Sequence, residues 1–403
     1  MGLPIALAIE SRGHEVKAFD VDAVVIRNLT ERHHPFIEHD LKDYLDASRI
    51  TIIPIDELVI WSDVILIIVQ TPNGPEYEGV TPFPDERQPF DVSYLREATR
   101  NISEVLDRTR VRHLVVVVST VLPGTVDSVV KPELSPYAVL AYSPLFIAMG
   151  TAIRDFLKPE FVLIGTDDPE ARALSHEFYE TLTTSPIVHT SIKSAELAKV
   201  AYNTFIGLKI VYANTLMEIC YKTGADLAEV TNVLMHGHER ILSAKYLSGG
   251  MGDGGSCHPR DSIALSWLAE QLTLSHDIFA DVMVARQHQT AWLASLAIEE
   301  AQRESCSIVL LGLAFKANTN IVTGSSARLL QYYLDERGYA PKLYDPLVNG
   351  DDAFHFSRSV FVVSTNHDTF KELTFPRGSV VIDPWDIILE QSNVRIIRIG
   401  RQH

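Results

Sequence analysis

Short apolar runs alternate with amphipathic stretches over the first half of the chain. The stretch 91–107, for example, places its apolar residues at the three- and four-residue spacing of a helix. The apolar runs have strand length and are rich in β-branched residues: 14–20, 63–69, 114–119, 138–143 and 161–165. Nearly continuous apolar strands separated by helices are typical of a parallel sheet that is buried on both faces. The pattern therefore predicts such a sheet.

The middle of the chain changes to a helical period. From Ser194 to about Ser295 there are few β-branched runs, and residues 195–224 keep a helical spacing of apolar positions over thirty residues. Gly224 stands where a glycine would end this helix. A helix of this length usually joins domains or pairs with a second copy of itself.

The last hundred residues return to the alternating pattern. A helix is predicted at 325–338, between apolar runs at 307–315, 340–346, 359–368 and 379–385. The predicted fold class is α/β, with two Rossmann-like parallel-sheet domains joined by a central long-helix domain. The predicted domain boundaries are 1–190, 191–300 and 301–403. Ligands of such sheets bind at the carboxyl ends of the strands.

Composition excludes several function classes. The 403 residues carry 35 basic and 52 acidic side chains, and the net charge of −17 would repel nucleic acid and anionic membranes. No apolar run is long enough to span a bilayer. Cys220, Cys257 and Cys306 lie far apart, without the spacing of a metal site or a disulfide framework. This usage predicts a reducing cytoplasm and no bound metal.

The amino-terminal sequence has the pattern of the second half of a dinucleotide-binding unit. Gly2 opens a helix, Gly13 ends it, and Asp20 closes the following strand. An acid there accepts hydrogen bonds from the ribose hydroxyls and opposes a 2′-phosphate, so NAD is favoured over NADP. The alternative is that Asp20 is a turn residue. The first strand and the earlier glycines of the fingerprint are missing, which predicts a gap in the sheet and a natural start upstream.

A cysteine lies in a glycine loop, GDGGSCHPRD, at residues 252–261. Packing cysteines usually lie in apolar elements, whereas polar and flexible neighbours would leave Cys257 accessible as a nucleophile. The alternative is a small residue in a tight turn.

Several short motifs together resemble the UDP-glucose/GDP-mannose dehydrogenase family. The matching stretches span nearly the whole chain: GLPIALA (2–8), FDVD (19–22), VQTP (69–72), STVLPGT (119–125), GTAIRDF (150–156), AELAKVAYNT (195–204), GGSC (254–257), GLAFK (312–316) and YDP (344–346). The resemblance implies an NAD-binding domain, a helical segment that forms a homodimer, and a C-terminal domain that binds the nucleotide of a UDP- or GDP-linked sugar.

In that family, the C6 alcohol of the sugar is oxidised twice to a carboxylate, with two NAD⁺ used in succession. The resemblance implies that Cys257 is the nucleophile that holds the aldehyde. Lys199 and Asn203 would polarise the reacting oxygen from one helix face, and Asp261 would orient Lys199 or a water. Without the resemblance, Lys199, Asn203 and Asp261 would be interpreted as a solvated lysine, a capping asparagine and a loop acid.

The resemblance also implies binding residues. Cofactor contacts are expected from Gly2, Asp20, Thr71, Pro72 and Thr120, with Thr120 beside the nicotinamide. Substrate contacts are expected from Gly254, Gly255, Lys316 and Arg240, the last resembling an arginine that reaches the neighbouring subunit.

One departure from the family concerns the second oxidation. Leu145 stands where the family has a glutamate that helps to position the hydrolytic water, and a leucine cannot accept a proton. His258 is a candidate replacement because an imidazole can activate water near neutral pH. The alternatives are an oxidoreductase that stops at the aldehyde, an enzyme of the β-hydroxyacid dehydrogenase type, and a catalytically silent nucleotide-sugar-binding protein.

Overall fold

The computed structural model describes residues 1–33, 38–72, 88–148, 150–242, 249–251, 259, 269–322, 324–350 and 354–399. The chain divides into two compact units, Met1–Leu208 and Lys209–His403. The division falls inside the long helix α8 (Ile192–Thr223). The finer division into three domains stays a prediction.

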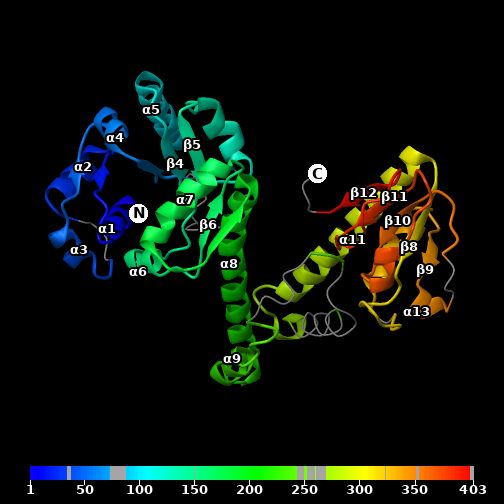
Figure 1. Ribbon diagram of the computed structural model, residues 1–403. Coiled ribbons are helices and arrows are strands. Elements are labelled where there is room, and N and C mark those ends of the chain that lie inside the picture. The colour runs from blue at the N-terminus through cyan, green and yellow to red at the C-terminus, as the bar shows by residue number, and fades with distance from the viewer. Residues whose placement is uncertain are drawn as a thin grey trace. The chain divides into compact units, whose positions relative to one another are not determined.

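The first unit contains a five-stranded sheet (Figure 1). Its strands, in spatial order, are β3 (Val64–Ile67), β4 (His113–Val117), β5 (Ala138–Tyr142), β6 (Val162–Gly165) and β7 (Ile187–Thr190). The pairs β3–β4, β4–β5 and β6–β7 are parallel, as the sequence predicts. The β5–β6 pair is antiparallel, so the expectation of a wholly parallel sheet is wrong at this pair.

A separate two-stranded sheet lies near the amino terminus. It pairs β1 (Lys17–Ala18) with β2 (Thr51–Ile52) in parallel, and β3 is an end strand of the other sheet. The sheet is therefore interrupted between β1 and β3, where the sequence predicts a gap.

Helices cover both faces of the larger sheet. On β4, Val115 and Val117 belong to one core cluster, whereas Leu114 and Val116 belong to another on the opposite face. The helices of this unit before α8 are α1 (Gly2–Glu10), α2 (Ala23–Thr30), α3 (Leu41–Ala47), α4 (Ile55–Trp61), α5 (Ser93–Thr109), α6 (Ala152–Leu157) and α7 (Pro169–Leu182).

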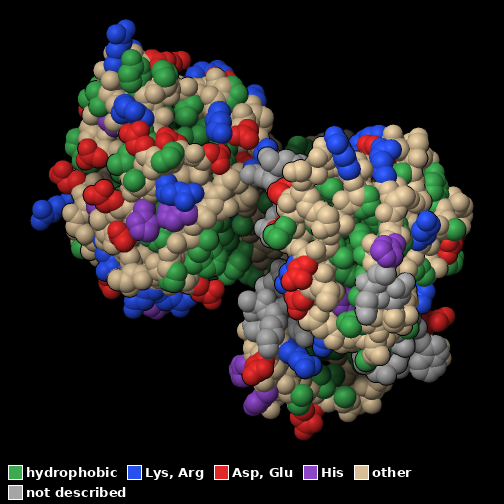
Figure 2. Space-filling model, turned by 45° about the vertical axis from the view of Figure 1, so that its right-hand side comes forward, with side chains coloured by type: hydrophobic (Ala, Val, Ile, Leu, Met, Phe, Trp, Pro, Cys, Tyr) green, Lys and Arg blue, Asp and Glu red, His purple; other side chains and the backbone are tan. Residues whose placement is uncertain are grey.

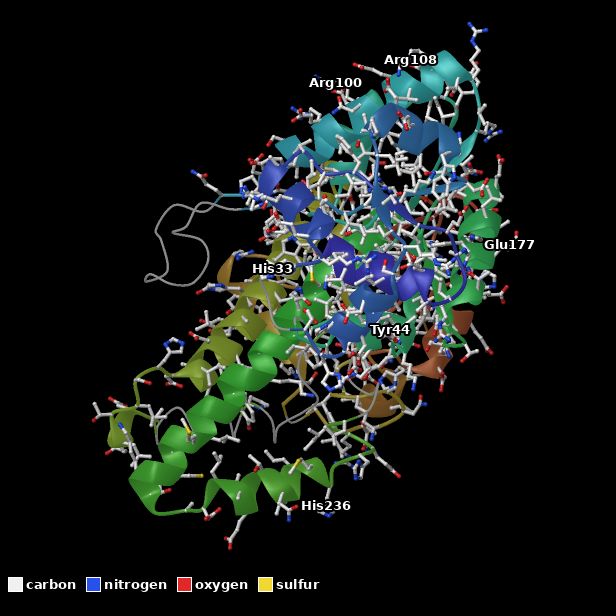
Figure 3. All side chains as sticks on the ribbon, turned by 90° about the vertical axis from the view of Figure 1, so that its left-hand side faces the viewer. His33, Tyr44, Arg100, Arg108, Glu177 and His236 are labelled. Carbon is white, nitrogen blue, oxygen red and sulfur yellow. The ribbon has the colours of Figure 1, made fainter. Side chains whose placement is uncertain are left out.

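Ion pairs on α5 lie at the surface of this unit. Figure 3 labels Arg100 and Arg108 on this helix, and the Arg100 guanidinium donates to both carboxylate oxygens of Glu133 at 3.1 and 3.2 Å. Arg108 lies 2.8 Å from a carboxylate oxygen of Asp56 on α4. Exposed pairs of this kind contribute about 0–1 kcal/mol each, so the apolar core dominates the stability of the unit.

The second unit contains a wholly parallel sheet in the order β12-β11-β10-β8-β9. The strands are β8 (Ser307–Leu311), β9 (Lys342–Tyr344), β10 (Ser359–Val363), β11 (Val380–Asp383) and β12 (Arg395–Arg398). Its described helices include α9 (Leu227–Met235), α11 (Ile278–Glu304), α12 (Ser326–Glu336) and α13 (Pro346–Asn349). The four apolar runs predicted here all form strands.

Helix α8 ends as its sequence predicts. Gly224 follows Thr223 with φ +79°, and its N–H donates to the carbonyl of Cys220 at 2.9 Å. Among the described residues, no helix is long and apolar enough to cross a membrane. On the face shown in Figure 2, acidic and basic side chains are interspersed rather than gathered into a basic patch.

Candidate active site

Two strand ends of the first unit are joined by side-chain hydrogen bonds. The Ser119 hydroxyl donates to the Val69 carbonyl at 2.6 Å and accepts from the Val69 N–H at 3.1 Å. The Thr71 hydroxyl donates to the Thr120 carbonyl at 2.7 Å. Thr71 and Thr120, both expected at the cofactor, therefore lie together at the carboxyl ends of β3 and β4.

Glu196 ties helix α8 to the segment that follows Thr120. Its side chain is fully buried, and its two oxygens accept the N–H groups of Gly124 at 2.5 Å and Val126 at 2.7 Å. Val126 opens a short π-helical turn, Val126–Val130. The buried carboxylate thus satisfies two backbone donors and holds this segment against the helix.

Lys199 lies one helical turn beyond Glu196 and is only 7% exposed. Its Nζ donates to Asn203 Oδ1 at 3.2 Å, as expected for positions four apart on one helix face. Burial lowers the pKa of the Lys199 amine from the ordinary value of 10.5 because desolvation disfavours the charged form. The buried amine therefore releases its proton more readily than an exposed lysine does.

The Lys199 amine lies beside one ring of an aromatic cluster. The Lys199 amine lies 5.1 Å from the centre of the Phe146 ring, within cation–π range. Phe146 contacts Phe161 and Tyr202, each with ring centres 4.8 Å apart. The neighbouring Leu145 is half-buried and packs against apolar core clusters. The environment at Leu145 is thus apolar.

Two further residues expected at NAD, Gly2 and Asp20, belong to the amino-terminal part of the unit. Gly2 is the first residue of α1, and a Cβ added there would meet no atom within 4 Å. The first backbone N–H groups of a helix have no partner inside the helix and are suited to contact a phosphate. Asp20 follows β1, and one of its oxygens accepts the Asp22 N–H at 2.9 Å. Its position after the strand fits a ribose contact, while the hydrogen bond is also that of a turn residue.

In the second unit, a buried hydrogen-bonded pair, Asp345 and His367, supports the segment that carries Lys316. Asp345 Oδ2 accepts the N–H groups of Leu313 at 2.7 Å and Ala314 at 3.0 Å, and lies 3.1 Å from His367 Nε2. Burial raises the pKa of Asp345, but the hydrogen bonds from His367 and the two N–H groups outweigh it and leave this pKa below 3.8. The Lys316 side chain itself is exposed.

Several predicted site residues lie outside the described residues: Gly254, Gly255, Cys257, His258 and Asp261. Arg240 is described and is exposed, and it belongs to the second unit. Their predicted roles stay predictions.

Glu196, Asp345 and His367 hold backbone segments of the candidate site in place, and none of the three was predicted from the sequence. Glu196 and Asp345 stand inside the motifs AELAK and YDP, but a motif does not say which backbone groups a carboxylate will reach. Their donors lie 70–72 and 31–32 positions away along the chain, so only tertiary folding brings them together.

The sequence was matched by models of one protein family and by individual proteins of known activity. The sequence profile of the UDP-glucose/GDP-mannose dehydrogenase family matches in two parts, its NAD binding domain over residues 1–183 and its central domain over residues 193–286. GDP-mannose 6-dehydrogenase of Pseudomonas aeruginosa is 30% identical over 358 residues, which cover 86% of this chain and 79% of that protein. UDP-glucose 6-dehydrogenase TuaD of Bacillus subtilis is 27% identical over 413 residues, covering 100% and 85%.

A solved structure supports the same relationship. The ternary complex of GDP-mannose dehydrogenase from Pseudomonas aeruginosa superimposes with a TM-score of 0.85 at 26% identity, over 98% of this chain and 97% of that one. The α/β fold and NAD as the cofactor, both expected from the sequence, are thereby confirmed. The chain belongs to the UDP-glucose/GDP-mannose dehydrogenase family and is an NAD-dependent dehydrogenase.

Proposed function

We propose that this enzyme oxidises the C6 alcohol of a UDP- or GDP-linked sugar to the carboxylate. The observation that carries the proposal is the buried Lys199 amine, which is hydrogen-bonded to Asn203 on a helix face that Glu196 ties to the strand end bearing Thr120. The relatives named above, a GDP-mannose and a UDP-glucose 6-dehydrogenase, support both the reaction and the substrate class.

The first oxidation converts the alcohol to an aldehyde. Gly2, Asp20, Thr71, Pro72 and Thr120 would hold NAD⁺, which would supply the hydride acceptor. The chain must stabilise the developing alkoxide as the hydroxyl proton leaves. Lys199 and the Asn203 amide are suited to this because a cation and an N–H donor in a dry site stabilise negative oxygen strongly.

The second oxidation requires a covalent intermediate, and we assign the nucleophile to Cys257. The thiolate adds to the aldehyde carbon and forms a C–S bond, giving a thiohemiacetal. Transfer of hydride from this carbon to a second NAD⁺, with loss of the hydroxyl proton, would leave a thioester. Water then attacks the carbonyl carbon, the C–S bond breaks, and the carboxylate and the free thiol are released.

Thioester hydrolysis is the step at which this chain departs from its family. Leu145 packs among apolar side chains and supplies no base, so His258 is proposed to activate the water. The His258→Ala variant is expected to complete both hydride transfers once and then stall as the acyl-enzyme, which intact-protein mass spectrometry detects. Normal turnover in this variant would contradict the assignment.

We also propose that α8 forms a homodimer contact. The described part of this helix exposes a series of large apolar side chains at 40–55% of their surface: Leu197, Phe205, Ile206, Leu208, Tyr212 and Met217. Apolar surface of this kind marks protein–protein contacts. Light scattering at micromolar concentration tests the dimer, and a monomer would reject it.

The function is tested by incubating the purified chain with NAD⁺ and a panel of UDP- and GDP-sugars while NADH is followed at 340 nm. Two NADH per sugar, with a uronic acid as product, are expected. One NADH per sugar would indicate an enzyme that stops at the aldehyde. No NADH with any sugar, although the sugar binds, would favour a silent binding protein.

A further inference from the structure

A chain of hydrogen bonds joins the carboxyl ends of three neighbouring strands in the second unit. The strands β10, β8 and β9 lie side by side in its sheet (Figure 1). Asp345 directly follows β9, and His367 lies in the segment after β10. His367 Nε2 lies 3.1 Å from Asp345 Oδ2, and both side chains are fully buried. The pair therefore lies at the edge where ligands of parallel sheets bind.

The other ring nitrogen of His367 holds the segment after β8. His367 Nδ1 accepts the Asn318 N–H at 2.9 Å. Because Nδ1 is the acceptor, a neutral imidazole carries its hydrogen on Nε2, which then donates to Asp345 Oδ2. Only this tautomer makes both hydrogen bonds. The ring thus connects a buried carboxylate to a backbone N–H of the segment that carries Lys316.

Asn318 has a backbone conformation that needs such a partner. Its φ is +58°, in the left-handed region that costs energy for most residues other than glycine. Its side chain is attached as well, since Nδ2 donates to Asp368 Oδ2 at 2.7 Å and Oδ1 accepts the Asp368 N–H at 3.3 Å. Two consecutive residues, His367 and Asp368, therefore hold Asn318 in place.

Lys316 lies in the loop that these hydrogen bonds hold. The Phe315 N–H donates to the Ile321 carbonyl at 2.9 Å, so residues 316–320 form the tip of a short closed loop. The Lys316 side chain is exposed, whereas the loop is attached to the fully buried His367. The cation is thus open to a ligand, and a buried group fixes the backbone that carries it.

We propose that His367 is a positioning residue for the contact of Lys316 with a phosphate of the nucleotide sugar. A lysine amine is a point charge on a flexible stem, so its placement depends on the backbone that carries it. The hydrogen bond from Asn318 to His367 orders this backbone before the substrate arrives and so reduces the cost of binding. The inference rests on the proposed function and adds a buried residue on which affinity for the substrate depends.

The test compares His367→Leu with His367→Asn. Leucine has a similar size but accepts no hydrogen bond. Asparagine carries its oxygen on Cγ, the atom to which Nδ1 is attached in histidine, and can therefore still accept the Asn318 N–H. His355→Leu is the matched control because His355 is an exposed histidine of the same unit that precedes β10, at the opposite end of this strand.

His367→Leu is expected to raise KM for the nucleotide sugar about tenfold, the effect of one hydrogen bond on a binding constant. The kcat and the KM for NAD⁺ should stay within about twofold of the wild type, because only binding shared by the ground state and the transition state is lost. His367→Asn should recover most of the affinity, and His355→Leu should match the wild type. A lower kcat with unchanged KM, as a merely destabilised fold would give, overturns the proposal. Equal KM values for His367→Leu and His367→Asn would also overturn it.

Hydrogen exchange tests the attachment without catalysis. Mass spectrometry of a peptide spanning residues 315–322 should show faster exchange of the Asn318 amide in His367→Leu, because water replaces Nδ1 as its partner. His367→Asn and His355→Leu should exchange like the wild type. Unchanged exchange in folded His367→Leu rules out the attachment.

Binding of free nucleotides separates this inference from the proposed function. If the wild type oxidises no sugar, the proposed function fails, but titration calorimetry with UDP and GDP still decides the role of His367. Weaker binding of one nucleotide by His367→Leu than by the wild type and His367→Asn supports that role. Equal affinities in the wild type and His367→Leu, or no binding of either nucleotide by the wild type, overturn it.

Discussion

Replacing Glu196 by glutamine changes one atom at the junction between α8 and the segment after Thr120. In the wild type, each carboxylate oxygen accepts one backbone N–H, from Gly124 and from Val126, at a fully buried position. A glutamine side chain has one accepting oxygen, and its NH₂ group must face the other N–H. One buried donor is then unsatisfied, at a cost of about 1–3 kcal/mol, and the charge-assisted bonds favour the upper end of this range.

We therefore expect Glu196→Gln to lower the free energy of unfolding by about 1–3 kcal/mol. The kcat should fall while KM for the sugar changes little, because the segment after Thr120 shifts relative to Lys199. Urea unfolding followed by circular dichroism gives the first quantity, and initial rates of NADH formation give the second. Glu177→Gln is the control, since Glu177 is exposed on α7 (Figure 3).

Either of two results would contradict these expectations for Glu196→Gln. An unfolding free energy for Glu196→Gln within about 0.5 kcal/mol of the wild type, the range of ordinary surface substitutions, would show that the carboxylate does not hold the segment. A wild-type kcat in a destabilised variant would show that the junction supports the fold but does not position the site.

Two further changes test the buried amine and a close contact in the second unit. Lys199→Met should reduce kcat at least about 100-fold, yet unfold at higher urea at pH 7, because the folded state no longer buries an amine. Because folding lowers the pKa of Lys199, the unfolded chain binds more protons than the folded chain between that pKa and 10.5. The free energy of unfolding of the wild type should therefore rise with pH in this range, and its difference from that of Lys199→Met should narrow. Urea titrations from pH 7 to 10.5 measure both. Gly312→Ala should lower stability by about 1–3 kcal/mol in thermal unfolding, since Gly312 has φ +92° and a Cβ would lie 2.8 Å from the Thr365 N and Oγ1. A Tm equal to that of the wild type would contradict the last expectation.

The sequence predicted the elements well because apolar periodicity is a local property. The runs at 114–119 and 359–368 are apolar over a strand length and became β4 and β10. The end of α8 at Gly224 was equally predictable, since it needs only a residue that adopts a positive φ.

Strand pairing was less predictable because it joins segments that are distant along the chain. Nothing local to residues 162–165 shows that β6 runs antiparallel to β5. The strand β12 (Arg395–Arg398) mixes apolar and basic residues at an edge of its sheet and gave no clear apolar run.

The same distinction applies to the site. The placement of Lys199 beside Asn203 follows from a four-residue spacing on a helix, so it can be predicted without the tertiary structure. The tertiary structure alone decided that Glu196 holds the segment after Thr120 and that Trp385 lies against Gly250. The physical reason is that both contacts join positions far apart along the chain. A buried carboxylate requires hydrogen-bond donors, and such a close approach of backbone to a ring requires a residue without a Cβ. Only folding brings these partners together.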